Sequence, residues 1–236
     1  MNLHDVFTRE VCAAREHMAV VIRRQERLWQ EIRDSTSQWH HATEIVCSRL
    51  PLRGWYLSGQ EPAPLVVRLA KHIEAEAWAD VDRLMLQHVP LFRPEDHGRW
   101  LGNNGVPSHC IDRFRRFVGH HQQGNYEEAT FLGLPLIDEV CLHLYGVEFT
   151  RKGKGSTQPA IASAASTTVW AKLGKEFVSD FGSLQDTIVE ARLHDEDYWC
   201  RHAILHGKMQ RPMGLKDSAK CCLAIAFLIH NRDAGQ

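Results

Sequence analysis

The sequence predicts an all-α protein built as a multi-helix bundle. Apolar residues recur at steps of three and four in most long segments, which is the spacing of a helix with one buried face. No run of alternating apolar and polar residues is regular enough to indicate a β-sheet. With 236 residues, 44% of them apolar, the chain can bury the core of one large domain or of two small ones.

Two helices are predicted before the first proline. The first runs from Leu3 to about Asp34, contains no glycine or proline, and carries arginines and acids between its apolar positions. We interpret it as an amphipathic helix packed on the domain; a dimer helix and an RNA-binding arginine stripe are the alternatives. The Ser-Thr-Ser stretch at 35–37 predicts a break that caps a second helix over 37–50, which Pro51 ends.

Three longer helices and one short piece are predicted in the middle of the chain. The first helix covers Pro64 to Val89, and a turn-rich connection follows, with a short helical piece around 95–101. The next two helices cover Ser108 to Gln122 and Asn125 to Tyr145. Pro135 is expected to kink or split the second of them.

The last third of the chain ends in its most apolar predicted helix. Short helices are expected over 169–181 and 183–192. The basic, glycine-rich stretch 151–159 lacks the spacing of a phosphate-binding P-loop. We interpret it as a surface loop, with a contact to a phosphate backbone as the alternative. The final helix, Ser218 to Ile229, is apolar nearly all round, so we expect it at the centre of the bundle.

Charge and cysteine content narrow the classes of function. The net charge of −1 creates no global field for nucleic acid or for an anionic membrane. The segment from Tyr198 to the C-terminus, however, holds six Lys or Arg against two acids and is locally basic. The seven cysteines lack metal-binding spacing, so we interpret them as reduced core thiols of a cytoplasmic protein. No apolar run approaches a membrane span and the N-terminal residues lack a signal-peptide core, so no membrane partner is expected.

The candidate site is the segment Arg201-His202-Ala203-Ile204-Leu205-His206-Gly207. Histidine gives or takes a proton near neutral pH, and arginine offers a permanently charged planar fork for phosphate oxygens. Metal-independent RNA cleavage requires these two functions. Residues five apart lie roughly 140° apart on an ideal helix, so one helix does not aim both side chains at one phosphate. Either Gly207 loosens the last turn, or two copies face each other.

Other interpretations of this segment remain open. His202 and His206 share a helix face and could bind zinc, but no glutamate adjoins the first histidine and no third ligand is obvious. Arg201 and His206 could also simply place cations near a helix end, where they suit the dipole. Lys208 and Arg211 follow closely and are candidates for holding flanking RNA phosphates. We expect no metal and no other cofactor.

The segment resembles the R-[polar]-x-x-x-H signature of HEPN domains (higher eukaryotes and prokaryotes nucleotide-binding). Gly207 matches the R-N-x-x-x-H-G variant, with His202 in place of the commoner asparagine. The resemblance covers roughly the C-terminal half of the chain. We therefore predict a HEPN-like four- or five-helix bundle over 108–236, with 1–107 as an N-terminal helical extension or regulatory region.

The resemblance implies a symmetric homodimer that pools two motifs in one cleft. It implies a metal-independent endoribonuclease (a hydrolase of RNA) from a toxin–antitoxin, abortive-infection or other antiviral, phage-defence system. In such an enzyme His206 is the acid/base catalyst, Arg201 the phosphate clamp and His202 an auxiliary group, and an antitoxin or regulatory protein is a further partner. No tyrosine follows the motif, so the modification of a nearby tyrosine in some HEPN toxins is not expected. The alternative is a non-catalytic HEPN-like module that binds a protein or a nucleotide.

Overall fold

Every regular element in the described part of the computed structural model is helical. The structure describes residues 3–57, 61–89, 94–146, 193–194 and 199–233, and of residues 3–23 it describes the backbone alone. No strand occurs in these ranges, which confirms the predicted all-α class. The elements are α1 (Leu3–Arg49), η1 (Pro51–Arg53), α2 (Ala63–Glu74), α3 (Trp78–His88), α4 (Pro94–Asn103), α5 (Ser108–Gln122), α6 (Tyr126–Tyr145), α10 (Arg201–Leu205) and α11 (Leu215–Asp233).

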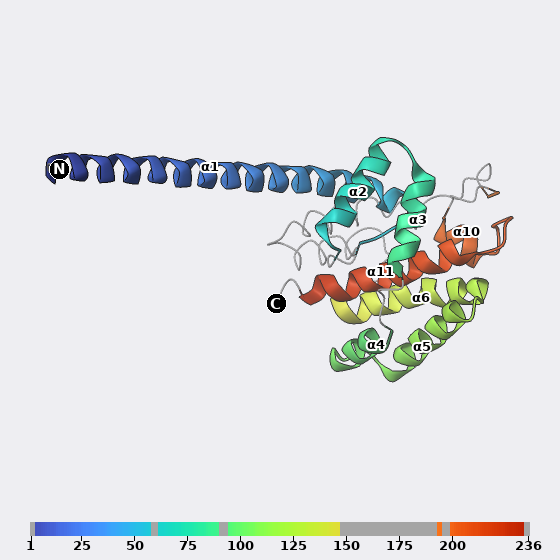
Figure 1. Cartoon of the computed structure of the whole chain (residues 1–236). Coiled ribbons are helices and arrows are strands. Elements are labelled where there is room, and N and C mark those ends of the chain that lie inside the picture. Colours follow the sequence, from blue (N-terminus) through green and yellow to red (C-terminus); the bar gives the residue numbers. More distant parts are fainter. Residues whose placement is uncertain (1–2, 58–60, 90–93, 147–192, 195–198, 234–236) are drawn as a thin grey trace.

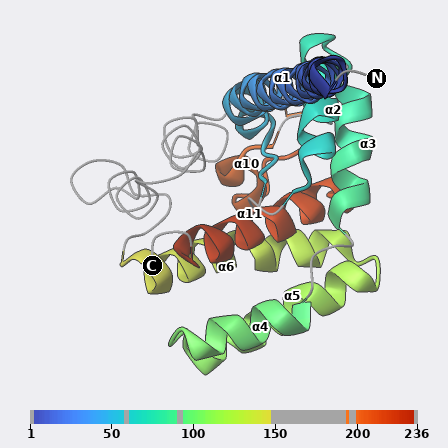
Figure 2. The ribbon, with the colours of Figure 1, turned by 60° about the vertical axis from the view of Figure 1, so that its left-hand side comes forward.

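The central element is α11, which packs along α6 in the middle of the bundle (Figure 1). The packed end of α1, together with α2 and α3, lies on one side of this pair, and α5 and α4 lie on the other (Figure 2). All residues from Asp217 to Ile229 are buried. This confirms the predicted central position of the last helix, although α11 begins three residues earlier than expected, at Leu215.

One hydrophobic core runs through the bundle. It contains side chains of the first helices, such as Val46 and Leu69, and side chains of α5, α6 and α11, such as Phe117, Leu136 and Phe227. The regions before and after residue 107 therefore contribute to the same core. Their division into two domains stays a prediction.

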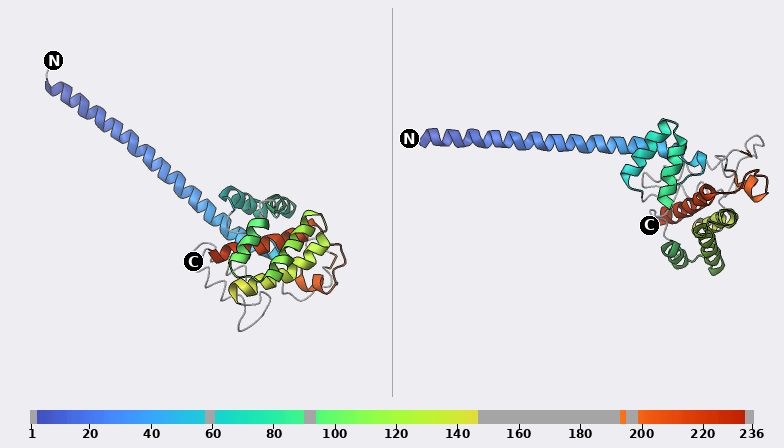
Figure 3. Two further views of the ribbon diagram at one scale, coloured as in Figure 1. Left: turned by 90° about the horizontal axis from the view of Figure 1, so that it is seen from below. Right: turned by 45° about the vertical axis from the view of Figure 1, so that its right-hand side comes forward.

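α1 is one continuous helix of 47 residues, so the predicted break at 35–37 is wrong. Serine and threonine lower helix propensity only slightly, so they do not stop a helix unless tertiary contacts favour a turn. The described side chains from Arg24 to Gln38 are exposed, and burial begins at Ala42. The buried turns belong to the second predicted helix, so the interpretation that the helix over Leu3 to about Asp34 packs on the domain is wrong for its described side chains, which are all exposed. Most of α1 projects away from the bundle (Figure 3).

The helix predicted over 64–89 is two helices, α2 and α3, so its predicted continuity is wrong. Glu76 has a φ of 54°, and hydrogen bonds from Glu76 N–H to Ile73 O and from Ala77 N–H to His72 O close α2. The residue at such a position is usually glycine, so the sequence carried no signal for this turn. The turn allows both helices to bury an apolar face: Val66, Leu69, Ala70, Ile73, Val81, Leu84 and Met85.

The other helices in the middle of the chain agree closely with the predictions. α5 has the predicted bounds, and the short piece expected around 95–101 lies within α4. Pro135 was expected to kink or split this helix; α6 runs through it as one helix, so the split does not occur. Because proline removes a single N–H donor, the packing of α6 on α5 and α11 is sufficient to keep the rest of the helix. Gly146, whose φ is 71°, ends α6.

Some predictions fall outside the described residues. These are the helices over 169–181 and 183–192 and the basic loop 151–159. Among the helices that the structure describes, none has the length and apolar character needed to cross a membrane.

α6 approaches its neighbours closely at Gly133. A Cβ added at this position would lie 2.7 Å from Cys221 Cβ on α11 and 3.0 Å from Phe117 Cε2 on α5. The Cβ of Cys221 is fixed to the α11 backbone, so the helices would have to move apart to admit a methyl group. Gly133 therefore sets the spacing of the central helix pair.

We expect Gly133→Ala to lower the free energy of unfolding by about 1–3 kcal/mol, because the added methyl group overpacks this contact. Gly119→Ala in α5 is the matched control, since nothing lies within 4 Å of its added Cβ. There the better helix propensity of alanine should stabilise the protein by up to about 1 kcal/mol. Urea unfolding followed by circular dichroism measures both changes. Wild-type stability of Gly133→Ala would contradict the close packing.

Candidate functional site

The predicted motif forms α10 and the turn that ends it. Arg201 is the first residue of α10, and His206 follows its last residue. Gly207 has a φ of 63°, and the N–H groups of Gly207 and Lys208 donate to carbonyl oxygens three and five residues earlier, at 3.0 and 2.8 Å. This pair of bonds is the Schellman arrangement, which closes a helix through a left-handed residue. It confirms that Gly207 ends the helix, and it fixes the backbone of His206.

Arg201 is held by an acid on α6. Its guanidinium forms an ion pair with the carboxylate of Asp138, and the two side chains are 17% and 20% exposed. Cys200 and Ala203 are buried beside it, where α10 packs on α6. An ion pair sheltered in this way is screened less by salt than an exposed one. Arg201 is therefore a fixed group and not a mobile surface cation.

The other side chains of the motif have different surroundings. His206 and Lys208 are exposed. The backbone of His202 lies within α10, but its side chain is outside the part of the chain that the structure describes. Within one copy, Arg201 faces α6 while His206 faces solvent, as expected for residues five apart on a helix.

Arg211 organises the start of α11. Its Nη1 and Nη2 atoms each donate to one carboxylate oxygen of Asp217, both at 2.8 Å. Asp217 Oδ2 also accepts a 2.9 Å hydrogen bond from the N–H of Gly214, which precedes the helix. The carboxylate thus caps α11 at the end where the helix dipole favours a negative charge. The guanidinium of Arg211 is engaged within the protein, and its contact with RNA phosphates stays a prediction.

Acids from other helices neutralise much of the basic C-terminal segment. Four of its six cations are paired or buried: Arg201 with Asp138, Arg211 with Asp217, Lys216 with Asp82, and Lys220 in the core. Two of these acids, Asp138 on α6 and Asp82 on α3, lie outside the segment from Tyr198 to the C-terminus. The count of its charges from the sequence therefore did not include them. The positive charge counted from the sequence therefore does not form an open basic surface at these four residues.

Lys220 carries its ammonium group into the core. Its Nζ lies 5.4 Å from the ring centroid of Trp55 and 5.6 Å from that of Trp199, and aromatic faces attract a cation. Burial lowers the pKa of Lys220 to about 8, because the charged form loses its water. The carboxylates of Asp217 and Asp82 raise this pKa in opposition, and nearby cations lower it further.

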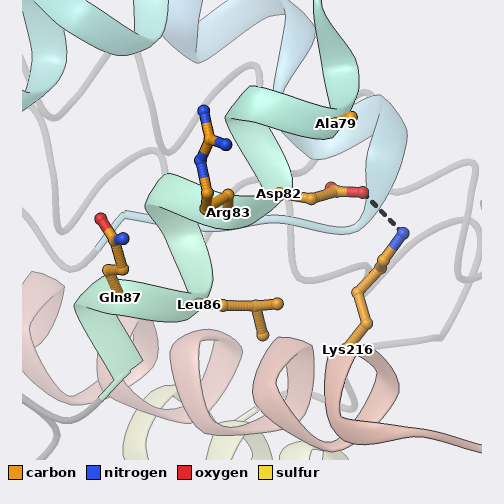
Figure 4. A pocket seen from close by; sticks show the side chains of 6 residues that line it. All are labelled: Ala79, Asp82, Arg83, Leu86, Gln87 and Lys216. Atoms are coloured by element: carbon orange, nitrogen blue, oxygen red, sulfur yellow. Dashed lines mark ion pairs between the residues drawn. The ribbon is translucent and has the colours of Figure 1, made fainter.

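Asp82 connects this buried group to an open pocket. Its Oδ1 accepts a 2.7 Å hydrogen bond from Trp55 Nε1, and its Oδ2 lies 2.6 Å from Lys216 Nζ. The pocket lies between α3 and α11, has a volume of about 450 Å³, and is lined by Ala79, Asp82, Arg83, Leu86, Gln87 and Lys216 (Figure 4). Neither Arg201 nor His206 lines it, so the pocket is separate from the predicted motif.

The described cysteines are packing groups. Six of them are buried and form no disulfide: Cys47, Cys110, Cys141, Cys200, Cys221 and Cys222. Burial raises the pKa of Cys110 to about 11 and also raises the pKa values of Cys141, Cys221 and Cys222, which disfavours the thiolate that acts as nucleophile or metal ligand. Within the described ranges, no group of three or more His, Cys, Asp or Glu side chains could hold a metal ion.

Comparisons with known protein families, with curated proteins and with solved structures find no match to this chain. The HEPN resemblance therefore rests on the motif residues together with the helical fold, and it stays a hypothesis.

Three important residues near the motif were not singled out from the sequence. Asp138 gives no local signal, because its partner Arg201 lies 63 positions further along the chain. Asp217 had a signal, since an acid in the first turn of a helix is a common cap. Lys220 also had one, because a lysine within a helix that is apolar nearly all round predicts a buried charge in need of partners.

Lys220→Met tests the buried ammonium group through the pH dependence of stability. Since the pKa is about 8 in the folded chain and ordinarily 10.5, the unfolded chain binds more protons between these two values. The free energy of unfolding of the wild type should therefore rise relative to that of Lys220→Met as the pH increases across this window. Urea unfolding of both proteins from about pH 7 to about pH 10.5 measures the difference.

Below about pH 8 the cost of burying the charge is fully present, so Lys220→Met should be at least as stable as the wild type there. The substitution orphans no acid, because Asp82 keeps Trp55 and Lys216, and Asp217 keeps Arg211. A stability difference that does not change with pH would contradict this account.

Asp138→Asn tests the anchoring of Arg201. We expect it to lower the free energy of unfolding by about 1–3 kcal/mol, because a sheltered guanidinium loses its counter-charge. Asp112→Asn on α5 is the control: Asp112 is 66% exposed and its partner Arg115 is 71% exposed. Exposed pairs of this kind contribute about 0–1 kcal/mol. Equal losses in the two variants would show that Asp138 does not anchor Arg201.

Proposed function

We propose that the protein is a cytoplasmic, metal-independent endoribonuclease of a phage-defence or toxin–antitoxin system, with a catalytic site formed by Arg201 and His206 of two copies. One observation carries this proposal: the two ends of α10 present the two groups that the chemistry needs. His206 is exposed at the end that the backbone hydrogen bonds close, and Arg201 is held by Asp138 at the start. The motif residues of the HEPN resemblance support the same chemistry.

Arg201 acts as the phosphate clamp. A guanidinium has five N–H donors, and the Asp138 carboxylate uses only part of this set. The remaining donors bind phosphate oxygens in a planar, bidentate way. Asp138 is a positioning residue in this scheme, because it holds the guanidinium plane in one orientation and does not touch the RNA.

His206 supplies the proton transfers. The 2′-oxygen of one ribose attacks the adjacent phosphorus while one His206 takes the 2′-hydroxyl proton. The bond from phosphorus to the 5′-oxygen breaks, and the partner's His206 gives that oxygen a proton. The products are a 2′,3′-cyclic phosphate and a free 5′-hydroxyl. No metal ion takes part.

The site needs two copies because one copy separates its two groups. Arg201 faces α6 and His206 faces solvent, so a single α10 does not direct both at one phosphate. A symmetric dimer in which two α10 helices face each other supplies two histidines and two arginines to one cleft. His202 is the auxiliary group of this cleft. Lys208, which is exposed, attracts flanking phosphates, and Arg211 assists while it stays paired with Asp217, the residue that caps α11.

A second candidate function is a non-catalytic helical module that binds a protein partner or a nucleotide. The pairing or burial of four of the six C-terminal cations favours it, because RNA binding draws on unpaired positive charge. In this case Arg201 serves the packing of α10 on α6, and the motif has no role in cleavage.

We expect induction of the wild-type protein in bacteria to fragment RNA and arrest growth, and Arg201→Ala and His206→Ala to lower cleavage by about a hundredfold or more. His109→Ala is the control, since His109 is an exposed histidine on another helix. Soluble levels of all variants are matched before RNA integrity is compared. Cleavage by the purified protein should persist in EDTA and leave 2′,3′-cyclic phosphate ends.

If wild type and both motif variants behave alike, also during phage infection, the nuclease is excluded. Titration with RNA and with nucleotides then tests the second candidate, because a module that binds only proteins should bind neither. Cleavage that stops in EDTA would contradict the proposed mechanism even if RNA is cut.

A further inference from the structure

α1 extends far beyond the bundle that it belongs to. Its 47 residues span about 70 Å at 1.5 Å per residue. Burial begins at Ala42, where α1 packs on α2, and the described side chains from Arg24 to Gln38 are exposed. Figures 1 and 3 show the helix leaving the bundle as a straight rod. The backbone of about 50 Å of helix, from Leu3 to Gln38, thus projects from the bundle.

The projecting part of α1 carries a heptad repeat. Ten positions alternate at steps of four and three, and we call them the seam: Phe7, Val11, Ala14, Met18, Val21, Gln25, Leu28, Ile32, Ser35 and Trp39. All but two are apolar, and the spacing covers more than four heptads, which is the pattern of a coiled coil. Leu28 on the seam is 50% exposed. The next two positions of the register, Ala42 and Val46, are buried in the bundle.

A helix with this pattern requires a partner along its seam. Isolated helices are marginal in water, and most helix stability in proteins comes from packing an apolar face. Among the side chains of α1 that the structure describes, the bundle buries those from Ala42 onward and none before it. A face with one apolar residue every three or four positions is suited to a second helix with the same repeat.

We propose that α1 forms a parallel, two-stranded coiled coil with α1 of a second copy of this chain. In the heptad register the a positions are Val11, Met18, Gln25, Ile32 and Trp39, and Gln25 is the one polar residue among them. Parallel pairing in register places Gln25 opposite Gln25 of the second copy, so that one amide meets another. A single polar residue at an a position specifies the register and a two-stranded coiled coil. In an antiparallel pair centred on the seam, Gln25 would instead face Val21. One pair of flanking charges also fits, since Glu10 at a g position would lie beside Arg15 at the e position of the partner helix.

Parallel pairing has a consequence for the bundles. Both lie at the C-terminal end of the coiled coil, next to each other, whereas antiparallel helices would hold them at opposite ends of a rod of about 50 Å or more. The coiled coil therefore raises the effective concentration of one bundle near the other. The inference does not depend on the proposed nuclease, because it concerns α1 alone and holds even if Arg201 and His206 have no catalytic role.

Leu28→Glu in the full chain tests the seam. Because Leu28 is exposed in one copy, the substitution leaves the bundle intact and acts only where a second helix would cover it. Gln30→Glu is the matched control, since it introduces the same residue and the same charge change two positions away, on an exposed part of the helix that faces away from the seam. Light scattering coupled to size exclusion, over a range of concentrations, measures the mass of each protein.

We expect wild type and Gln30→Glu to have twice the chain mass of 27.0 kDa and Leu28→Glu to dissociate, with a dimer dissociation constant raised about tenfold or more. A monomeric wild type would overturn the proposal and point to another cover for the seam. A Leu28→Glu variant as dimeric as wild type would also overturn it, and would place the dimer contact on the bundle, which leaves the nuclease proposal standing.

Orientation is tested by oxidation of Val11→Cys in a Cys12→Ser background. In the parallel coiled coil the two engineered thiols meet across the seam and form an intermolecular disulfide. In an antiparallel pair residue 11 lies opposite residue 35, and no disulfide forms. Full cross-linking of the oxidised dimer on a non-reducing gel is the expected result, and a dimer that resists cross-linking overturns the parallel arrangement.

Discussion

The buried ammonium group of Lys220 on the central helix needs stabilising neighbours, and four other parts of the chain lie around it or around its neighbour Asp217. α11 is buried from Asp217 to Ile229, so water does not solvate the charges of Asp217 and Lys220. Other groups of the protein must therefore stabilise these two charges. Arg211 and the N–H of Gly214 satisfy Asp217, and the rings of Trp55 and Trp199 lie beside the ammonium group. The hydrogen bond from Trp55 to Asp82 ties α3 to the same cluster. Segments from both ends of the chain are thus fixed around one charged group.

The same cluster places the motif helix. Trp199 packs on Gly54, where an added Cβ would lie only 2.6 Å from Trp199 Cε3, and α10 starts two residues later. The position of Arg201 therefore depends on η1 and α11 as well as on its own partner Asp138. In this arrangement His206 is exposed, whereas Arg201 is largely sheltered. A rigid support under one accessible histidine suits catalysis, whereas the neutralised cations nearby suit a packing role, and the two proposed functions differ on which of these features matters.

Two independent features underlie the proposed pairing with a second copy of the chain. The motif separates Arg201 from His206 within one copy, and the described seam positions Gln25, Leu28 and Ser35 are exposed. A parallel coiled coil brings two bundles to the same end without defining how they touch. In the proposed dimer, the bundle surfaces set the geometry of a shared cleft, while the long helix supplies proximity. The two proposals therefore assign dimer affinity and active-site assembly to different parts of the chain.

The sequence by itself determined the features that depend on neighbours along the chain. Helical periodicity predicted α5 and α6, Gly146 and Gly207 predicted helix ends, and the apolar run predicted a central last helix. Only the tertiary structure decided that α1 continues through 35–37 and that α2 ends in a turn at Glu76. Each outcome depends on which helix faces pack against other helices. It also decided the pairing of Arg201 with Asp138, 63 positions apart, since no local pattern records which charges the packing of distant helices brings together.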